Sequence, residues 1–176
     1  MQNESYCLGL DISSTVVGYC VSSSKNDILD AGYIDIHKEK SIKGKAHTVA
    51  NHLDPHSFDP LIIIVEDSLS GFGGGRTSQQ TIVKLAKCNA VISYVVEALY
   101  EVDIDHVNVS TLRKAVFGKS REKGVDSKQF VREQLENKID LSKFIVYNKR
   151  NNYDKKNYDM LDAMVASLYH WYTIKD

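Results

Sequence analysis

The chain has 176 residues, of which 43% are hydrophobic and 26% charged, and its formal net charge is −1. This composition predicts one soluble globular domain over residues 1–176, and it excludes disordered and collagen-like chains. No apolar run is long enough to span a bilayer, and the first residues lack the basic start of a signal peptide. Cys7 and Cys20 lie in apolar runs. We therefore expect a cytoplasmic protein with reduced cysteines.

Charge is distributed unevenly along the chain. Residues 1–109 hold 8 Lys and Arg against 14 Asp and Glu, whereas residues 110–156 hold 13 against 6. A basic block between acidic segments predicts a local surface for a polyanion such as a nucleic acid. Alone, the signal is weak, because most charged runs are simply solvated faces.

Three antiparallel strands are predicted at the start of the chain, over residues 6–12, 16–21 and 28–36. The first strand ends at a carboxylate, Asp11, and a serine-rich turn leads into the second. A modest helix over residues 41–54 follows.

Residues 61–65 form the most strand-like run of the chain, Leu-Ile-Ile-Ile-Val, and it ends at Glu66. A continuous apolar run is typical of a central parallel strand that is buried on both faces. The ends of such strands form the edge at which α/β proteins build their sites. One strand-end carboxylate would carry little weight, but Glu66 is the second after Asp11, and the pair indicates a site.

The segment 71–76 contains four glycines in five residues, which predicts a mobile loop. It is not a phosphate-binding loop, because no Gly-Lys-Ser/Thr follows. Phe72 in this loop is either an exposed accident or an aromatic side chain that inserts into a ligand, and Arg76 is a candidate phosphate contact.

The longest predicted helix spans residues 77–100, with Thr77 or Ser78 as its N-cap. Small and apolar side chains share adjoining faces of this helix. Because small side chains let another helix approach closely, the pattern favours a partner helix, which a second subunit could supply.

The basic block is predicted to contain a strand over 103–109, a helix from a Ser110-Thr111 cap to Val116, a basic loop over 119–123 and a helix over 127–138. A polar loop with Lys155 and Lys156 then runs directly into an acidic helix. Cations therefore lie next to candidate carboxylates, where a phosphate backbone would need them.

The last helix begins at residue 157, and its apolar residues recur at helical spacing through Tyr172. Asp159 and Asp162 project from one face of its first turn, with Cβ atoms about 5–6 Å apart. The helix macrodipole explains Asp159 but not Asp162, which has apolar neighbours. Two such carboxylates repel each other unless a cation lies between them.

Three short motifs occur in a set order along the chain. They are Leu8-Gly9-Leu10-Asp11-Ile12-Ser13-Ser14-Thr15 with Gly18-Tyr19, then Ile64-Val65-Glu66, then Tyr158-Asp159-Met160-Leu161-Asp162-Ala163. In this order and at these intervals, the motifs resemble those of the RuvC-type Holliday junction resolvases of the RNase H-like superfamily, phage-encoded relatives included. The resemblance covers most of the chain.

The resemblance implies an α/β, RNase H-like fold with a five-stranded mixed sheet, three antiparallel strands followed by two parallel ones, flanked by helices. It implies an endonuclease that cuts four-way or other branched DNA in recombination and repair, working as a homodimer in the cytoplasm of a bacterium or a phage-infected cell. The helix 77–100 is then the candidate dimer interface.

The resemblance also implies the site residues. The catalytic tetrad would be Asp11, Glu66, Asp159 and Asp162, and Lys128 would be a catalytic or phosphate-contacting lysine, a role for which Lys119 and Lys123 compete. The predicted DNA contacts are Phe72, Arg76, Lys119, Arg121, Lys123, Lys155 and Lys156. The chain departs from the family at one point. The family commonly has an aromatic wedge shortly after the second acidic residue, whereas this chain has Leu69 there and Phe72 only later.

Four crowded carboxylates raise one another's pKa values unless divalent cations neutralise them, and hard oxygen ligands suit Mg²⁺, with Mn²⁺ as a substitute. Two such ions about 3.5–4 Å apart would activate water and stabilise the leaving 3′ oxygen of a phosphodiester. We expect Asp11 to bind both ions, because it should lie deepest.

Three alternatives stay open. The same chemistry could act on RNA–DNA hybrids, as in an RNase H-like ribonuclease, or on flaps and forks more broadly. Residues 8–18 also resemble the first phosphate loop of actin/hexokinase-type ATP-binding domains, but those proteins need a second domain for which the chain lacks the length. A catalytically dead nucleic-acid-binding module is disfavoured, because all four acidic positions are filled.

Overall fold

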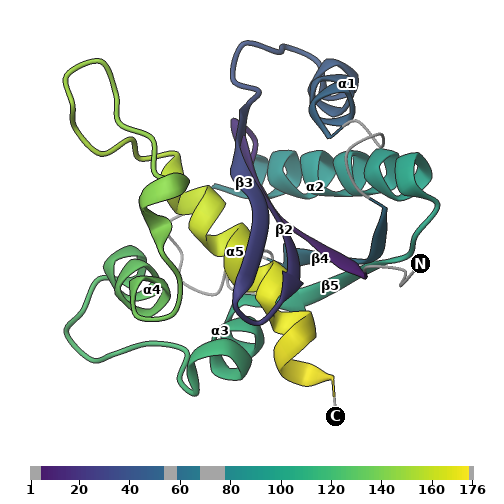
Figure 1. Ribbon diagram of the computed structural model, residues 1–176. Helices are drawn as coiled ribbons and strands as arrows, with labels where there is room; N and C mark the ends of the chain where they lie inside the picture. Colours follow the sequence, from purple (N-terminus) through teal and green to yellow (C-terminus); the bar gives the residue numbers. More distant parts are fainter. Residues whose placement is uncertain (1–4, 54–58, 68–77, 175–176) are drawn as a thin grey trace.

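A five-stranded mixed sheet forms the centre of the molecule, in the order β3-β2-β1-β4-β5 (Figure 1). The computed structural model describes residues 5–53, 59–67 and 78–174. The strands β1, β2 and β3 are antiparallel neighbours, whereas β4 and β5 run parallel to β1. This confirms the predicted arrangement of strands. Their bounds are Tyr6–Ile12 (β1), Val16–Ser24 (β2), Asp27–Asp35 (β3), Pro60–Asp67 (β4) and Ile104–Asn108 (β5).

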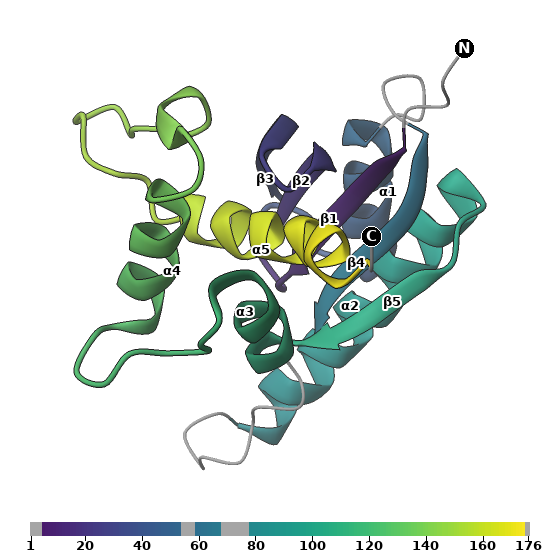
Figure 2. The same cartoon turned by 60° about the horizontal axis from the view of Figure 1, so that its bottom comes forward.

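Helices cover both faces of the sheet (Figures 1 and 2). On one face lie α1 (Ile42–His52) and α2 (Gln79–Tyr100), which pack against each other. The helix α5 (Asn157–Thr173) crosses the other face, with α3 (Val109–Phe117) and α4 (Ser127–Glu136) packed beside it. A 3-10 turn, Leu141–Lys143, follows α4. None of the described helices is long and apolar enough to cross a lipid bilayer.

Alternation along β1 divides its side chains between two cores. Leu8, Leu10 and Ile12 point to the α1/α2 face and are buried there, whereas Cys7 points to the α5 face. The same alternation applies to β4, where Ile63 and Val65 join the first core and Ile64 the second. Side chains two residues apart share a face, so Asp11 and Glu66 both belong to the α5 face. Cys7 and Cys20 are both buried, and both thiols are free.

Two glycines allow α5 to lie directly on the sheet. A Cβ atom built on Gly9 of β1 would overlap the backbone of Ala163 and Ser167 in α5. A Cβ on Gly18 of β2 would overlap the backbone of Asp159. Since backbone atoms cannot move aside as a flexible side chain can, only glycine fits at both positions. These glycines therefore set how closely the acidic turn of α5 approaches the end of β1.

A buried hydrogen-bonded network fixes the other half of α5. Ser167 Oγ donates to the carbonyl of Cys7 at 2.8 Å and lies 2.5 Å from Ser22 Oγ. The indole Nε1 of Trp171 donates to Ser22 Oγ at 2.8 Å. Both serines are fully buried, so each hydroxyl is satisfied where water could not reach it. The network fixes the position of α5 along β1 and β2.

Two details of the predicted helices need correction. The start of α3 was assigned to a Ser110-Thr111 cap, but the N-cap is Asn108, whose side chain accepts from the Ser110 amide. On α2, part of the small-residue face is not free for another subunit. Asn89, Ser93 and Val96 are buried inside the chain, because α2 itself packs on the sheet and α1.

Candidate active site

The pairing of β1 with β4 brings Asp11 and Glu66 together. Leu10 pairs with Val65 in parallel register, so the residues that follow each of them lie side by side at the ends of neighbouring strands. Both point to the α5 face by the alternation described above. Two carboxylates 55 positions apart in the sequence thus become neighbours through strand pairing alone.

The helix α5 adds a third carboxylate. Asp11, Glu66 and Asp162 form the acidic cluster, in which the three contributing oxygens all lie within 4.8 Å of one another. Glu66 is buried, with 7% of its surface exposed, and burial also raises the pKa values of Asp11 and Asp162. That Asp11 lies deepest stays a prediction.

Asp159 lies one helical turn before Asp162, at the edge of the acidic cluster and not within it. Its charge still raises the pKa values of Asp11 and Glu66. Burial raises the pKa of Asp159 itself to about 6, with Asp162 adding to the effect and Lys128 opposing it. Of the four predicted carboxylates, three meet directly and the fourth acts on them through space.

Burial and mutual repulsion make the acidic cluster hard to ionise. Burial, followed by the charge of Asp162, raises the pKa of Glu66 to about 8. Burial, followed by the charges of Glu66, Asp162 and Asp159, raises the pKa of Asp11 well above its ordinary value. Burial also raises the pKa of Asp162, although Arg113 opposes it. If all three groups were ionised, their negative charge would exceed what the surrounding protein neutralises.

The donor set fits a hard divalent cation. All three groups offer carboxylate oxygens, the ligands that Mg²⁺ and Mn²⁺ prefer over nitrogen or sulfur. Oxygens within 4.8 Å of one another are close enough to share one ion. A bound cation would stabilise the ionised form of every member, which reverses the effect of their repulsion.

Arg113 is a neighbour of the acidic cluster that the sequence analysis missed. Its Nη2 donates to Asp162 Oδ1 at 3.0 Å, and its Nη1 donates to Ser127 Oγ at 2.7 Å. Its Nε is buried and has no hydrogen-bond partner among the residues that the structure describes. Arg113 thus links three helices, α3, α4 and α5, at the edge of the cluster. The signal in the sequence was its place one turn into the helix that follows β5, the strand beside β4.

Lys128 lies close to the acidic cluster, as the resemblance led us to expect. Its charge lowers the pKa values of Asp11, Asp159 and Asp162. Its Nζ lies 4.9 Å from the ring centre of Tyr158, and the side chain is otherwise exposed. Its role in catalysis remains a prediction.

A groove of about 1060 Å³ opens beside the cluster, between α3 and the loop that leads into α4. Arg121 and Lys123, two of the predicted DNA contacts, line it together with Arg113. Asp67, the neighbour of Glu66, lies at its edge. The groove therefore joins the acidic site to a basic wall.

The other predicted DNA contacts differ in how freely they could meet a phosphate. Lys119 pairs with Glu122 at 2.5 Å, and Lys156 pairs with Asp35 on β3 at 2.5 Å. Lys155 is exposed. Phe72 and Arg76, and with them the wedge position Leu69, lie outside the described residues.

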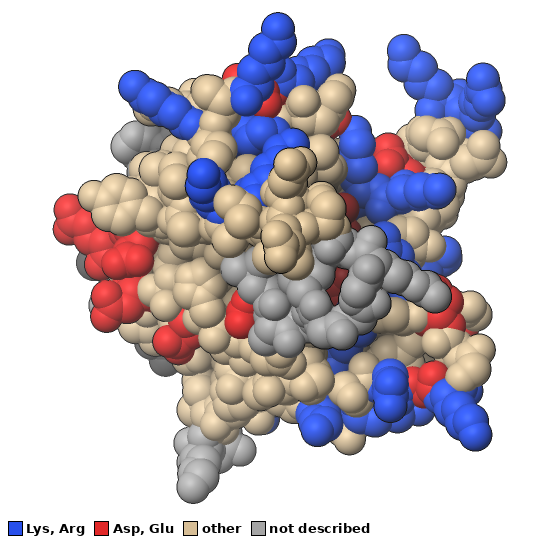
Figure 3. Space-filling view, turned by 180° about the vertical axis from the view of Figure 1, so that it is seen from behind, with Lys and Arg blue, Asp and Glu red and all other residues tan. Residues whose placement is uncertain are grey.

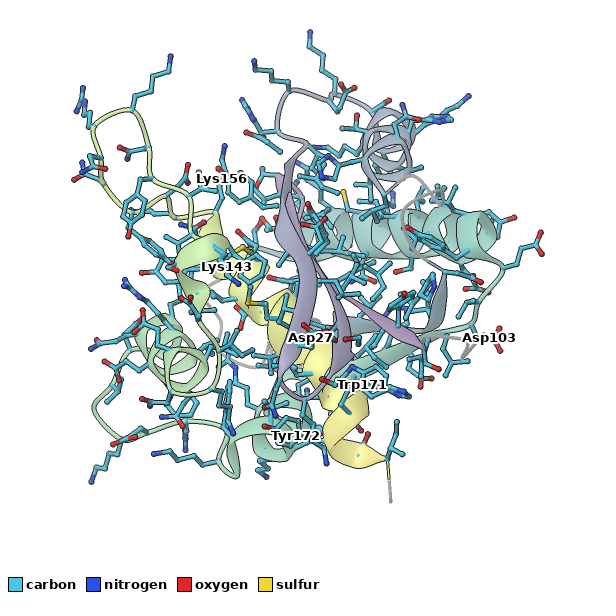
Figure 4. The ribbon with its side chains drawn as sticks, in the orientation of Figure 1. Asp27, Asp103, Lys143, Lys156, Trp171 and Tyr172 are labelled. Atoms are coloured by element: carbon cyan, nitrogen blue, oxygen red, sulfur yellow. The ribbon has the colours of Figure 1, made fainter. Side chains whose placement is uncertain are left out.

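The charged surface has a clear pattern on the face opposite to that of Figure 1. Figure 3 shows Lys and Arg side chains gathered along the top of this face and on two projections at its right, the loop before α5 and the loop between α3 and α4, whereas Asp and Glu gather mainly at its left edge. Figure 4 places Lys156 at the start of α5, next to the first of these projections.

Similarity to known proteins is found in structure and not in sequence. No protein-family model matches the chain, and no curated protein matches it significantly. The RuvC resolvase of Thermus thermophilus, solved with a Holliday junction substrate, superposes with a TM-score of 0.63 at 13% identity, over 96% of this chain and 93% of that one.

Two further solved structures share the fold. The yeast mitochondrial Holliday junction resolvase has a TM-score of 0.61 at 18% identity, over 96% of this chain and 78% of its own. The fowlpox virus resolvase, solved with Holliday junction DNA, has a TM-score of 0.54 at 16% identity, over 94% and 96% of the two chains. The chain therefore has the RNase H-like fold of the RuvC-type resolvases, which confirms the predicted fold.

Proposed function

We propose that the chain is a metal-dependent, structure-selective endonuclease that cleaves Holliday junctions and related branched DNA during recombination and repair. Two divalent cations, Mg²⁺ or Mn²⁺, would be held by Asp11, Glu66, Asp159 and Asp162. The observation that carries the proposal is the acidic cluster, in which oxygens from β1, β4 and α5 converge within 4.8 Å. It occurs at the edge of a sheet whose fold matches that of solved resolvases.

Cations held by these carboxylates would activate water and stabilise the leaving 3′ oxygen. The remaining tasks belong to the chain itself. Arg113 holds Asp162 in place through the 3.0 Å ion pair. It also donates a hydrogen bond to Ser127, the residue that precedes Lys128 in α4. Lys128 is exposed next to the carboxylates, so its ammonium group is suited to contact the scissile phosphate.

Arg121 and Lys123 belong to substrate binding in this proposal. Both line the groove that opens beside the acidic cluster. Phosphates along a DNA arm would neutralise these cations, and release of counterions from the DNA would favour binding.

A homodimer is part of the proposal, because resolution of a four-way junction requires two symmetric cuts. The helix α2 is the candidate interface. Its surface exposes Val83, Val91 and Tyr94, with 50%, 37% and 71% of their area accessible. Apolar side chains of this size on one helix suit an isologous contact with a second copy.

The test is cleavage of a matched substrate panel in Mg²⁺. The panel contains a labelled four-way junction, a fork, a flap, a linear duplex and an RNA–DNA hybrid of the same sequence. We expect the junction to be cut fastest and symmetrically, and Asp11→Asn to lose cleavage while it keeps junction binding.

Each other outcome rejects a defined part of the proposal. Preference for the hybrid would support the ribonuclease alternative, and equal cutting of flaps and forks would support a broader nuclease. Cleavage that Asp11→Asn leaves intact would reject the metal site. ATP hydrolysis without any nuclease activity would favour the actin/hexokinase-type alternative.

A further inference from the structure

A finger of residues 146–154 projects from the molecule just before α5 (the yellow-green loop at the upper left of Figure 1). Its stem is an antiparallel bridge between Tyr147 and Tyr153. Its tip is closed by Asn148, whose backbone amide donates to the Asn152 carbonyl at 2.8 Å and whose side chain accepts from the amides of Arg150 and Asn152. The finger is therefore internally hydrogen-bonded and does not need a ligand to form.

The base of the finger is tied to the catalytic helix. Asn157, the first residue of α5, is fully buried and bonds both backbone groups of Val146 with its side chain. Its Nδ2 donates to the Val146 carbonyl at 2.7 Å, and its Oδ1 accepts from the Val146 amide at 3.1 Å. Asn157 is two residues from Asp159, so these hydrogen bonds connect the base of the finger to the acidic turn.

A line of aromatic rings and cations joins the finger to the acidic cluster. Lys128 lies beside the cluster and 4.9 Å from the ring of Tyr158. Tyr158 packs on Tyr153 with ring centres 5.3 Å apart, and Arg132 lies 4.7 Å from the Tyr153 ring. Tyr147, the bridge partner of Tyr153, extends the line outward. Arg132 is also paired with Glu136 at 2.7 Å, so Lys128 is the cation of this line that is left for a phosphate. Aromatic rings flanked by cations are the features that bind successive nucleotides of a strand.

The outer end of this line is exposed. Tyr147 has 57% of its surface accessible, and Lys149 and Arg150 at the tip are exposed and have no ion-pair partner within the described ranges. An exposed aromatic side chain beside two unpaired cations suits one sugar or base together with two phosphates.

From this placement we infer that the finger binds the DNA strand that leaves the active site. Tyr147 contacts a nucleotide, and Lys149 and Arg150 contact phosphates of the same junction arm. This inference rests on the proposed function, since it assigns a further contact surface for the same substrate. The finger provides affinity for the arm, and the acidic cluster provides the chemistry.

The test compares binding and cleavage in matched variants of the full chain. Junction affinity is measured by fluorescence anisotropy in Mg²⁺ at several salt concentrations, in a cleavage-deficient Glu66→Gln background. The Lys149→Ala/Arg150→Ala pair should weaken binding by about tenfold and make the slope of log affinity against log salt shallower by about 1.8. Tyr147→Ala should weaken it by about fivefold, and Tyr147→Phe should not.

The control removes two positive charges at the far end of α5. Lys25→Ala/Lys138→Ala takes away cations that lie 5.7 Å and 5.1 Å from the ring of Tyr172, which Figure 4 shows at the end of the helix opposite to Lys156. We expect this pair to leave junction affinity within about twofold of the parent, because exposed charges farther than the Debye length from the DNA contribute little.

Cleavage supplies the second readout. With the native Glu66 restored and enzyme below saturation, the finger variants should cut the junction more slowly, by the same factor as their loss of affinity. Equal affinity of the finger and control variants would overturn the inference while leaving the nuclease proposal intact. If the unmodified chain neither bound nor cut a junction, both the inference about the finger and the nuclease proposal would be rejected. Melting temperatures of all variants within a few degrees exclude loss of folding as the cause.

Discussion

The two halves of α5 lie on the same sheet but differ in whether their buried polar groups are stabilised by partners. In the second half, Ser167 and Trp171 meet Ser22 in a network whose buried hydroxyls and indole all have partners. In the first half, Asp162 joins Asp11 and Glu66 in a cluster whose pKa values are raised by burial and repulsion. The second half, whose polar groups are all hydrogen-bonded, fixes the helix and stabilises the fold. The first half can therefore hold carboxylates that lower the stability of the fold until a cation binds.

The largest expected difference between the halves is catalytic. Glu66→Gln removes a charge from the centre of the acidic cluster while it keeps the shape of the side chain. We expect junction cleavage to fall by more than about 10³-fold, which corresponds to roughly 4 kcal/mol of transition-state stabilisation. The metal-free protein should be no less stable, as measured by urea unfolding in EDTA at pH 8. A variant that cut normally would remove Glu66 from the site.

The second difference is the pH dependence of stability. The pKa of Glu66 rises from 4.5 to about 8 on folding, so between these values the folded state holds a proton that the unfolded state releases. The free energy of unfolding in EDTA should therefore fall as pH rises from about 5 to about 8, by on the order of a few kcal/mol.

Mg²⁺ provides the control for this pH effect. It should flatten the profile, because it stabilises the ionised carboxylates of the folded state. Without metal, Glu66→Gln should make the profile shallower but not flat, because the pKa values of Asp11, Asp159 and Asp162 stay raised in the folded state. A stability profile that rises through this pH range would contradict the account of the acidic cluster.

The third test acts on the boundary between the halves. Gly9→Ala places a Cβ against the backbone of Ala163 and Ser167, so α5 must move away from β1. We expect a loss of about 2–3 kcal/mol in urea unfolding. The matched control is Gly32→Ala on β3, where the atoms nearest to the new Cβ belong to the Tyr19 side chain, at 2.9–3.1 Å, and the ring can shift. Equal losses in the two variants would show that the approach of α5 is not limited at Gly9.

The smallest effect is expected in the satisfied half. Ser167→Ala removes the hydrogen bonds to the Cys7 carbonyl and to Ser22, and should lower the free energy of unfolding by about 1–2 kcal/mol. Single-turnover cleavage by the folded protein should stay within about threefold of wild type, since no atom of the acidic cluster is changed. A rate loss as large as that of Glu66→Gln would mean that the two halves are not separable.

Local patterns were enough to predict the elements that hold the carboxylates. The apolar runs before Asp11 and Glu66 gave the strands, and helical spacing gave the acidic turn at Asp159 and Asp162. That these groups meet depends on parallel pairing of β1 with β4 and on glycine contacts with α5, which no single stretch encodes. The prediction that these carboxylates meet in one site came from the resemblance to RuvC-type resolvases and not from their spacing in the sequence.

Contacts between distant positions were the ones missed. Arg113 and Asp162 are 49 residues apart, and Lys156 and Asp35 are 121 apart, so neither ion pair is visible in one sequence. The finger was predicted only as a polar loop, because its stem depends on a bridge and on the buried side chain of Asn157. The predictions for Phe72, Arg76 and Leu69 lie outside the described residues and stay predictions.

The central claim is that the first half of α5 holds a metal site and the second half does not. Titration of the DNA-free chain with Mn²⁺ by isothermal calorimetry at pH 7.5 tests this directly, with Asp162→Asn and Ser167→Ala as the matched pair. The account predicts binding to the wild type and to Ser167→Ala with the same affinity, and at least about tenfold weaker binding to Asp162→Asn. Equal Mn²⁺ affinity for all three proteins would contradict it.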